Sequence, residues 1–398
     1  MSKWEMVRLG EVFSLIRNGA SIKQGIVDGG YPITRIETIA NSEVDRNRMG
    51  YAGIQDITKY ESYVLQTGDI LMSHINSEKH LGKTAIYEKQ NDEIIIHGMN
   101  LLCLRPVAHL LNYRYGHYYF RSQRFKRMIP GITKKSVNQA SFTVTALKNL
   151  EIPLPPLEVQ QQMVSTLDAA FELLKLRKQQ LAELDVLIKS VFYEMFGDPV
   201  TNEKEWIKYP LSEVVSINPR KTELDSVDDN LEVSFVGMAD VSSDGVVEVS
   251  NIKKYQQVKK GFTYFYENDV LFAKITPCME NGKGGIAKNL MNSIGFGSTE
   301  FHVLRPIDNL SNSEWIYHLT SLTDFRIIAE KNMTGSAGQK RVPTNFFSKF
   351  MVPLPPFELQ NQFAGIVTKI EEQKAQVKQA IDETQQLFDS LMSRNFDN

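Results

Sequence analysis

The sequence has few of the features that mark a secreted, membrane-bound or cysteine-rich metal protein. Only two cysteines, Cys103 and Cys278, occur among 398 residues, which excludes a disulfide framework and a zinc finger. No run of about 18 apolar residues is present, and the first residues lack the charged and apolar parts of a signal peptide. We expect an unanchored cytoplasmic protein with no membrane partner, in which both cysteines are small core residues.

Motifs for catalysis and cofactor binding are also missing. Gly82-Lys83-Thr84 resembles the end of a phosphate-binding loop, but Ser77 stands where that motif needs glycine, and Gly284 follows the second Gly-Lys pair. The seven histidines never take the spacing of a zinc protease. Pro-Pro occurs only after leucine, so the Asn/Asp-Pro-Pro-aromatic loop of amino-group DNA methyltransferases is absent. We predict no catalytic residue, no metal site and no cofactor, and we interpret the histidines as structural or surface residues.

Acidic residues are absent from the segment between Glu93 and Glu151, which contains nine lysines and arginines. The net charge of the whole chain is -2, but residues 1–150 hold 20 basic and 13 acidic side chains. Residues 198–350 hold 17 basic and 20 acidic side chains. The first part of the chain is therefore predicted to attract a polyanion.

The chain repeats itself at a displacement of 200 residues. Residues 152–160 (IPLPPLEVQ) match residues 352–360 (VPLPPFELQ), and shorter matches occur in the same order. These shorter matches relate Asp69-Ile70-Leu71 to Asp269-Val270-Leu271, Gly82-Lys83 to Gly282-Lys283, and Leu104-Arg105-Pro106 to Leu304-Arg305-Pro306. The repeat predicts a globular part and a helical part, each present twice.

Each helical part has apolar residues at alternating spacings of three and four. The first series is interrupted only by Arg177, and the second keeps the same register with Lys374 and Thr384 as polar interruptions. The two series are Met163, Leu167, Ala170, Leu174, Leu181, Leu184, Ile188, Val191 and Met195, and Phe363, Val367, Ile370, Val377, Ile381, Phe388 and Leu391. Pro156 suits the first turn of a helix. We predict a first helix over residues 157–196, about 60 Å long at 1.5 Å per residue.

The connectivity predicts that the two long helices are antiparallel. Residues 198–350 join the end of the first helix to the start of the second, and the ends of a domain usually lie close together. The predicted fold class is α+β: two mixed αβ domains (1–150 and 198–350) separated by a pair of long antiparallel coiled-coil helices (151–197 and 351–398), with a pseudo-two-fold repeat. The alternative is that each helix packs on its own domain.

Within the globular parts, short β-rich runs alternate with turn signals. We predict strands at residues 93–96, 101–104 and 246–249. Helices are predicted at residues 112–128, ended by Pro130-Gly131, and at residues 313–331.

The candidate recognition residues are basic or polar side chains in these helices and in the loops around them. Arginine can hydrogen-bond guanine edges or phosphates, and Gln339 and Arg341 suit adenine and guanine respectively. The candidates for DNA binding are Lys83, Arg114, Arg121, Arg124, Lys126, Arg127, Lys134, Lys135, Lys274, Lys283, Gln339, Lys340 and Arg341. The competing interpretation is that the aromatics of residues 113–127 face the core while the basic side chains are simply solvated. Arg105 and Arg305 are expected to be structural.

The two Leu-Pro-Pro-Leu/Phe-Glu-x-Gln segments, each opening a long helix after a domain of about 150 residues, resemble the specificity subunits of Type I restriction-modification enzymes. The resemblance covers the whole chain. It implies that Pro155, Pro156, Glu158 and Gln160, with Pro355, Pro356, Glu358 and Gln360, mark the helix starts typical of the family. It also implies two target-recognition domains that read a split sequence in double-stranded DNA, and a helical spacer that fixes the unread gap.

The resemblance further implies partners that carry the chemistry. Two modification (methyltransferase) subunits are expected to dock on the helices and bring S-adenosylmethionine, while ATP and Mg belong to restriction/translocase subunits reached through them. The chain itself is expected to be non-catalytic. Because residues 198–350 have an acidic excess, their DNA face is either locally basic or dependent on partner subunits. The alternative functions are a protein scaffold with two binding heads and an enzyme with an unrecognised site.

Overall fold

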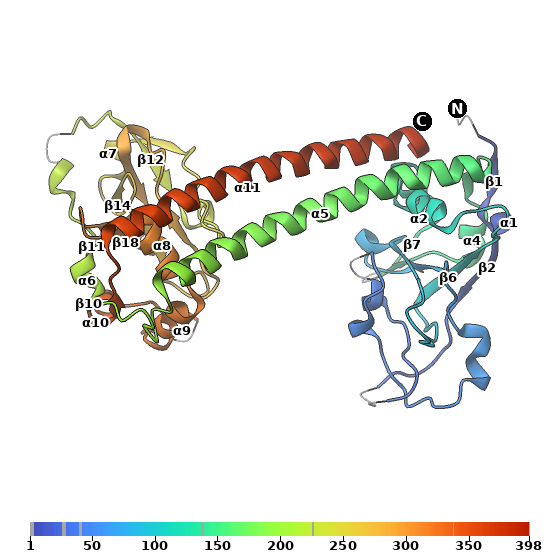
Figure 1. Ribbon diagram of the computed structural model, residues 1–398. Helices are drawn as coiled ribbons and strands as arrows, with labels where there is room; N and C mark the ends of the chain where they lie inside the picture. The colour runs from blue at the N-terminus through green and yellow to red at the C-terminus, as the bar shows by residue number, and fades with distance from the viewer. Residues whose placement is uncertain are drawn as a thin grey trace. The chain divides into compact units, whose positions relative to one another are not determined.

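The computed structural model describes residues 4–25, 29–39, 42–136, 139–224, 227–336 and 338–397. The chain forms two compact units (Figure 1). The first unit contains Met1–Lys178 and Gln379–Asn398, and the second contains Gln179–Lys378. Each unit therefore combines a globular domain with the beginning of one long helix and the end of the other.

The first unit contains a four-stranded antiparallel sheet, two smaller sheets and several helices. Its strands are β1 (Met6–Arg8), β2 (Phe13–Asn18), β3 (Ile70–Ser73), β4 (Ile75–Asn76), β5 (Thr84–Ile86), β6 (Leu101–Pro106), β7 (Lys134–Lys135), β8 (Ala140–Ser141) and β9 (Glu151–Pro153). Its α-helices are α1 (Leu9–Val12), α2 (Tyr113–Arg121), α3 (Gln123–Ile132) and α4 (Val144–Lys148), followed by the start of α5 (Leu157–Phe196). Short 3-10 turns include η4 (Glu78–His80).

The second unit repeats this plan and adds a second four-stranded sheet. Its strands are β10 (Lys208–Pro210), β11 (Val215–Ile217), β12 (Glu232–Val236), β13 (Ile252–Lys254), β14 (Thr263–Tyr266), β15 (Val270–Ala273), β16 (Gly284–Ile286), β17 (Ile294–Gly297), β18 (Phe301–Pro306) and β19 (Met351–Pro353). Its α-helices are α6 (Leu211–Val214), α7 (Tyr255–Val258), α8 (Ser313–Ser321), α9 (Thr323–Lys331), α10 (Thr344–Lys349) and α11 (Phe357–Met392). The added sheet has the order β13-β12-β17-β14.

The main sheets of the two units have the same topology. The strand order is β2-β6-β3-β5 in the first unit and β11-β18-β15-β16 in the second. Even the register is conserved at the displacement of 200, since Ile70 pairs with Leu104 and Val270 with Leu304. The internal repeat read from the sequence and the predicted α+β class are confirmed.

Both helices predicted beyond the sheets are broken into two. Ser122 leaves the helical conformation (φ -67°, ψ 157°), and its side chain caps α3 by accepting a hydrogen bond from the Phe125 amide. Leu322 makes the same break between α8 and α9 (φ -61°, ψ 142°). Predictions of one continuous helix at residues 112–128 and at 313–331 were therefore wrong, because a single capping or buried residue can end a helix without glycine or proline.

Two of the predicted strands are also wrong. Of residues 93–96, only Ile96 forms isolated bridges, with Ile33 and Val64, and of residues 246–249 only Val247 does so. These runs are rich in apolar residues, but each pairs with neighbouring segments through isolated bridges at one residue, so no continuous β-ladder forms. The strand at 101–104 is confirmed within β6, and Cys103 is buried in it, whereas Cys278 is half-buried.

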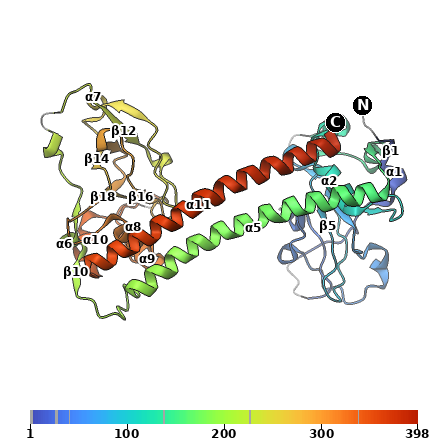
Figure 2. The same ribbon diagram turned by 45° about the horizontal axis from the view of Figure 1, so that its top comes forward.

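The long helices are antiparallel, as predicted. Within each unit, α5 and α11 run side by side in both views (Figures 1 and 2). In the first unit the ring of Phe171 lies 6.0 Å from that of Phe388, and the Arg177 guanidinium donates to the Thr384 hydroxyl. In the second unit the rings of Phe192 and Phe363 are 5.6 Å apart.

Every predicted seam residue of α5 and α11 is buried or half-buried. The polar interruptions are accommodated by partners: Thr384 accepts from Arg177, and Lys374 lies 2.8 Å from Asp185 and 2.6 Å from Glu371. No described helix is long and apolar enough to cross a membrane.

The end of α11 and the helical turn that follows it, η8 (Ser393–Asp397), belong to the core of the first unit. Phe388, Met392 and Phe396 are buried there, and the Phe396 ring lies 5.2 Å from that of Tyr115. On the other side of this core, α2 packs on β5 and lies next to α5 (Figure 2). The first unit is therefore assembled from both ends of the described chain.

A buried glutamine ties each long helix to its globular domain. The Gln160 amide nitrogen donates to the carbonyls of Leu110 and Pro155, both at 2.9 Å, and its oxygen accepts from the Asn112 amide at 2.8 Å. Gln360 makes the same three contacts with Leu310, Pro355 and Asn312, each at 3.0 Å. Because Asn112 and Asn312 cap α2 and α8, each glutamine fixes a short helix to the start of a long one.

The repeated Leu-Arg-Pro segments are structural, as expected. Arg105 donates through Nε and Nη2 to both carboxylate oxygens of Asp69, at 2.7 Å each. Arg305 holds Asp269 in the same way at 2.8 and 2.9 Å. Both carboxylates are buried, and each bidentate pair links two strands of a main sheet.

Five described histidines are packed inside the two units as neutral rings. Burial lowers the pKa of His74 and of His97 to about 4 and that of His117 to about 3 in the first unit. It lowers the pKa of His302 to about 4 and that of His318 to about 3 in the second unit.

These histidines predict a loss of stability in mild acid. In the unfolded chain each ring takes a proton below about pH 6.5, whereas in the folded chain it stays neutral until pH 3 to 4, so the stability present above pH 6.5 is lost as the pH falls. At pH 5.5 each ring is expected to cost about 1.4 kcal/mol relative to pH 7.5. Urea unfolding at the two pH values measures this difference. An H117F variant should reduce the pH dependence, and an unchanged dependence would contradict the assignment.

Candidate nucleic-acid interface

The loops singled out in the sequence form an exposed hairpin in each unit. In the first unit, Lys134 and Ile75 both pair with Ser141, so that β7, β8 and β4 form a small sheet with exposed Lys134 and Lys135. In the second unit, Thr334 and Arg341 exchange two backbone hydrogen bonds of 2.9 and 2.8 Å, and Arg341 bridges to Ile275. Each hairpin therefore lies beside the segment that follows a central strand of the main sheet.

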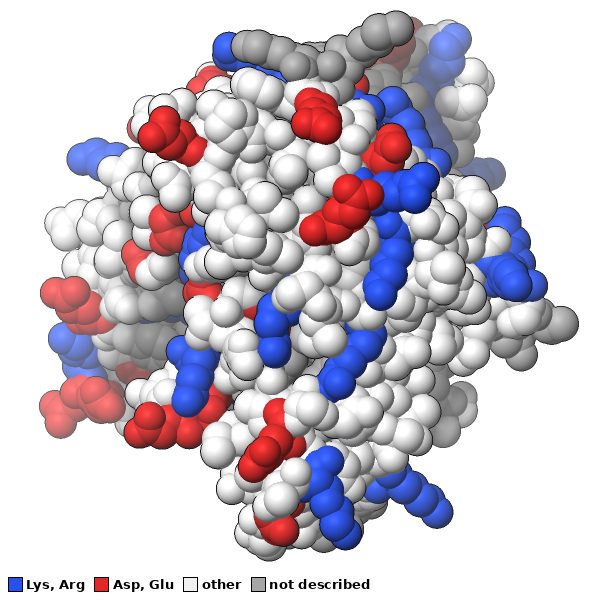
Figure 3. Space-filling model, turned by 90° about the vertical axis from the view of Figure 1, so that its right-hand side faces the viewer, with Lys and Arg blue, Asp and Glu red and all other residues white. Residues whose placement is uncertain are grey.

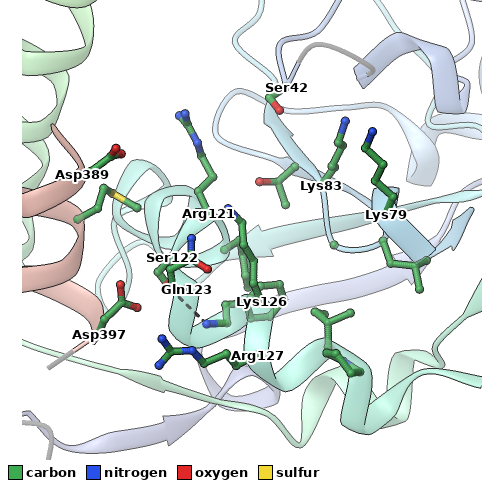
Figure 4. A pocket seen from close by; sticks show the side chains of 18 of the residues that line it. Ser42, Lys79, Lys83, Arg121, Ser122, Gln123, Lys126, Arg127, Asp389 and Asp397 are labelled. Carbon is green, nitrogen blue, oxygen red and sulfur yellow. Dashed lines mark hydrogen bonds between the residues drawn. The ribbon is translucent and has the colours of Figure 1, made fainter. Parts of the chain in front are cut away.

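A basic cavity of about 880 Å³ opens next to the first hairpin. Its walls are the α2–α3 turn, the η4 segment with the start of β5, and the last part of α11. Its cationic side chains are Lys79, Lys83, Arg121, Lys126 and Arg127, and its acidic ones are Glu78, Asp389 and Asp397. In Figure 4, Arg121, Lys83 and Lys79 extend toward the same space, with Asp389 and Asp397 on the opposite wall.

Arg121 is positioned by aromatic rings. Its guanidinium carbon lies 5.9 Å from the ring centre of Tyr118, 5.3 Å from that of Phe171 and 5.8 Å from that of Phe388. These rings come from α2, α5 and α11, and such cation–π contacts hold a guanidinium without neutralising it. Burial lowers the pKa of Arg121, although an arginine remains charged at neutral pH.

Two predicted arginines of the same region make contacts within the protein. Arg114 forms ion pairs with Glu88 at 2.6 Å and Asp168 at 3.0 Å. The Arg124 amide donates to Asp397 at 2.6 Å, and its Nη2 lies 3.5 Å from the Met6 sulfur. The solvated-face interpretation therefore does not describe them, because both hold parts of the first unit together.

The aromatics of this region are core residues. Tyr115, Tyr118, Tyr119, Phe120 and Phe125 are all buried. The alternative reading of the sequence is therefore correct for the rings, while Lys126 and Arg127 project outward and line the basic cavity.

In the second unit the predicted basic residues are mostly paired. Arg341 donates to both carboxylate oxygens of Glu300 at 2.9 and 2.8 Å, which raises the pKa of Arg341. The Lys283 ammonium donates to the Met238 carbonyl at 2.9 Å. Lys274 is half-buried, and burial lowers its pKa.

The tip of the second hairpin carries exposed Gln339 and Lys340. The sequence prediction is that Gln339 and Arg341 read bases. Gln339 is exposed, so a ligand can reach it, whereas two nitrogens of Arg341 are hydrogen-bonded to Glu300.

The face of the molecule on the side of the first unit is shown in Figure 3. Lysine and arginine side chains form a band from the upper right through the middle of this face, and most acidic side chains lie to the left of the band.

Two functional candidates were missed by the sequence reasoning. Lys79 lies between Ser77 and Gly82, a segment that the sequence analysis considered only as a possible phosphate-binding loop. Arg326 is buried in α9, stacks 4.3 Å from the Phe272 ring centre and donates to the carbonyls of Thr320 and Met279 at 2.7 and 3.1 Å. It also reaches the Lys283 carbonyl at 3.4 Å, so it positions the loop that carries that lysine. An arginine inside an otherwise apolar stretch, Phe325-Arg326-Ile327-Ile328, was the available signal.

Among residues 4–25, 29–39, 42–136, 139–224, 227–336 and 338–397, no group of three His, Cys, Asp or Glu side chains is arranged to hold a metal ion. The first unit presents a cationic cavity and an exposed hairpin, and the second unit presents an exposed hairpin of its own.

Comparisons with known proteins point in one direction. The family model described as "Type I restriction modification DNA specificity domain" matches twice, over residues 1–186 and 203–385. The chain is 30% identical over 421 residues to a putative type I restriction enzyme MjaX specificity subunit of Methanocaldococcus jannaschii, covering 98% of this chain and 92% of that protein. It is 40% identical over 195 residues to the EcoEI specificity subunit of Escherichia coli, covering 48% of this chain and 32% of that protein.

Solved structures share the fold. The S subunit of a Type-I restriction-modification system from M. genitalium aligns over 99% of this chain and 96% of that one, with a TM-score of 0.55 and 14% identity. A chain from a structure of a type I R-M system aligns with a TM-score of 0.56 and 18% identity, over 99% of this chain and 97% of that one.

Proposed function

We propose how the two units recognise DNA, on the basis that this chain belongs to the Type I restriction-modification DNA specificity family. It is a DNA specificity subunit with two recognition domains. Each unit reads one part of a split target through base edges in a DNA groove, while backbone contacts fix its position. Neither unit catalyses a reaction.

The observation that carries the proposal is the duplication of one recognition fold. The two main sheets have the same strand order and register, and the family domain matches twice. Two copies of a reader on one chain fit a target with two separate parts. Because α5 is a single helix of 40 residues shared by both units, the unread gap between those parts is set by helix length.

The long helices also offer equivalent surfaces for partners. Leu187 and Leu387 are related by the displacement of 200, and they are 43% and 52% exposed. Leu173, Leu176 and Val186 add further exposed apolar area on α5. Contiguous exposed apolar patches mark protein interaction sites, and Leu173 and Leu176, three residues apart, share one face of α5. Two modification subunits, one at each leucine, fit this arrangement, and restriction/translocase subunits join through them.

The chemistry is assigned to these partners. The modification subunits bind S-adenosylmethionine and transfer the methyl group, and the restriction subunits bind ATP and Mg²⁺. The complex acts on double-stranded DNA in the cytoplasm.

Methylome sequencing of cells that carry the complete system tests the proposal. The expected result is one methylated motif made of two short sequences separated by a fixed number of unspecified bases. A variant with exposed Gln339 and Lys340 changed to Ala is expected to relax one of the two sequences only. A continuous motif, or methylation that does not depend on this chain, would refute the proposal.

A further inference from the structure

The basic cavity of the first unit has a counterpart in the second unit. Gly82, Arg121 and Phe388 line the first cavity, and Gly282, Ser321 and Ile188 occupy the corresponding positions of a second cavity of about 510 Å³. Each cavity lies within its own unit, against a segment of a long helix. The two cavities differ in charge, although the folds around them are the same.

The cations of the first cavity are unpaired. Among the described residues, Lys79, Lys83, Arg121, Lys126 and Arg127 have no acidic partner within 4.0 Å. The three acidic side chains of the cavity contact other groups, namely Glu78 with Lys135 at 2.9 Å, Asp389 with the Gln385 side-chain amide at 3.0 Å, and Asp397 with the Arg124 backbone amide at 2.6 Å. The five cations outnumber these three carboxylates. The cavity therefore presents positive charge that the protein leaves available.

The second cavity is neutralised internally. It is lined by three lysines and four acidic residues. Lys374 is bound by Asp185 at 2.8 Å and Glu371 at 2.6 Å, and Lys288 by Glu314 at 2.5 Å. The position of Arg121 is occupied by Ser321, so no guanidinium is present there.

We propose that the first cavity binds phosphates of the DNA backbone and that the first unit supplies most of the salt-dependent, sequence-independent affinity of this chain. The second unit contributes mainly its base contacts. This inference rests on the proposed function and assigns the two recognition domains unequal energetic roles. It also accounts for the acidic excess of residues 198–350, because that unit does not need to attract the polyanion by itself.

The geometry favours a nucleic-acid backbone over an acidic protein segment. The cations come from three separate elements, and exposed Lys134 on the adjacent hairpin extends the cationic surface beyond the cavity. A DNA strand carries one phosphate per about 3.4 Å of axis, so several such cations can be contacted at once without any sequence requirement. The guanidinium of Arg121 is held in place by three aromatic rings, so it can contact a phosphate without first breaking an ion pair.

The test compares matched double variants of the full chain, assembled with its modification subunits. Binding to a duplex that contains the methylated motif, and to a scrambled duplex, is measured as a function of KCl concentration. Replacing Lys79 and Lys83 by Gln removes two cations, so the slope of log K against log salt is expected to fall by about 2, and by about 3 when R121Q is added. The matched control, K189Q with K288Q in the second cavity, is expected to leave the slope unchanged.

The outcomes separate this inference from the proposed function. A wild-type complex whose binding does not depend on salt refutes the function itself. A steep wild-type slope that the first-unit variants do not reduce, or that both double variants reduce equally, overturns the inference alone. A first-unit double variant that no longer assembles with the modification subunits, while the second-cavity control still does, shows that the cavity holds an acidic protein segment instead.

R121K separates charge from packing. It keeps the cation but loses the planar stacking on the rings, so the salt slope is expected to be retained. Because Lys79 is exposed and Lys83 is half-exposed, the double variant is expected to fold even if the triple variant does not.

Discussion

Removing seven residues from each long helix is expected to move methylation to a target whose unread gap is about three base pairs shorter. Seven residues span about 10.5 Å of helix, and base pairs are spaced at about 3.4 Å. Suitable segments are 175–181 and 378–384, because they include Arg177 and Thr384, which contact each other in the first unit. Both half-site sequences are expected to stay the same, since no residue of either globular domain changes. Methylome sequencing measures motif and gap together.

The phase of the deletion provides its own control. Seven residues are close to two helical turns, so the apolar seam stays in register, whereas five residues rotate one part of the seam by about 140° from the other. A five-residue deletion in each helix is expected to abolish methylation without creating a new gap. A seven-residue deletion that preserves the original gap, or that alters a half-site, would show that the helices do not set the spacing.

Replacing Gln160 by Leu is expected to destabilise the first unit by about 3 to 5 kcal/mol, because it leaves three buried backbone groups without a partner. These groups are the carbonyls of Leu110 and Pro155 and the amide of Asn112. Gln360→Leu is expected to do the same to the second unit.

Urea unfolding followed by tryptophan fluorescence distinguishes the two units, since Trp4 reports on the first and Trp206 and Trp315 on the second. Gln161→Leu changes the exposed neighbour and serves as the control, with an expected change within about 0.5 kcal/mol. An equally small effect of Gln160→Leu would mean that the start of α5 is held mainly by apolar packing.

The features predictable from the sequence are those that depend on local periodicity or on the repeat. The apolar spacing located both long helices, and the displacement of 200 anticipated that β3 and β15 occupy the same place in their sheets. The additional sheet β13-β12-β17-β14 is represented in the first unit only by isolated bridges, such as Val64 with Ile96 where the second unit pairs Tyr264 with Phe296, so the repeat did not reveal a full ladder. The helix break at Ser122 depends on a side-chain cap that composition does not specify.

The candidate site was predicted as a region but not residue by residue. The acid-free segment between Glu93 and Glu151 directed attention to the first unit. Which of its arginines is available depends on partners far away in the sequence: Asp168, 54 residues from Arg114, binds that side chain, while three rings leave Arg121 unpaired. The partner of Arg341, Glu300, lies 41 residues away. Ion pairs between residues so far apart produce no periodic pattern in the sequence, so the sequence does not predict them.

The position of Phe396 in the core of the first unit has a consequence during synthesis. Most of that unit leaves the ribosome early, yet Phe388, Met392 and Phe396 are translated only after the whole second unit, and until they arrive the apolar surface around Tyr115 and Phe171 stays uncovered. The second unit, made of one uninterrupted stretch, can complete its core earlier. The unit whose synthesis begins first therefore completes its core last, and until it does so its uncovered apolar residues are available to bind chaperones.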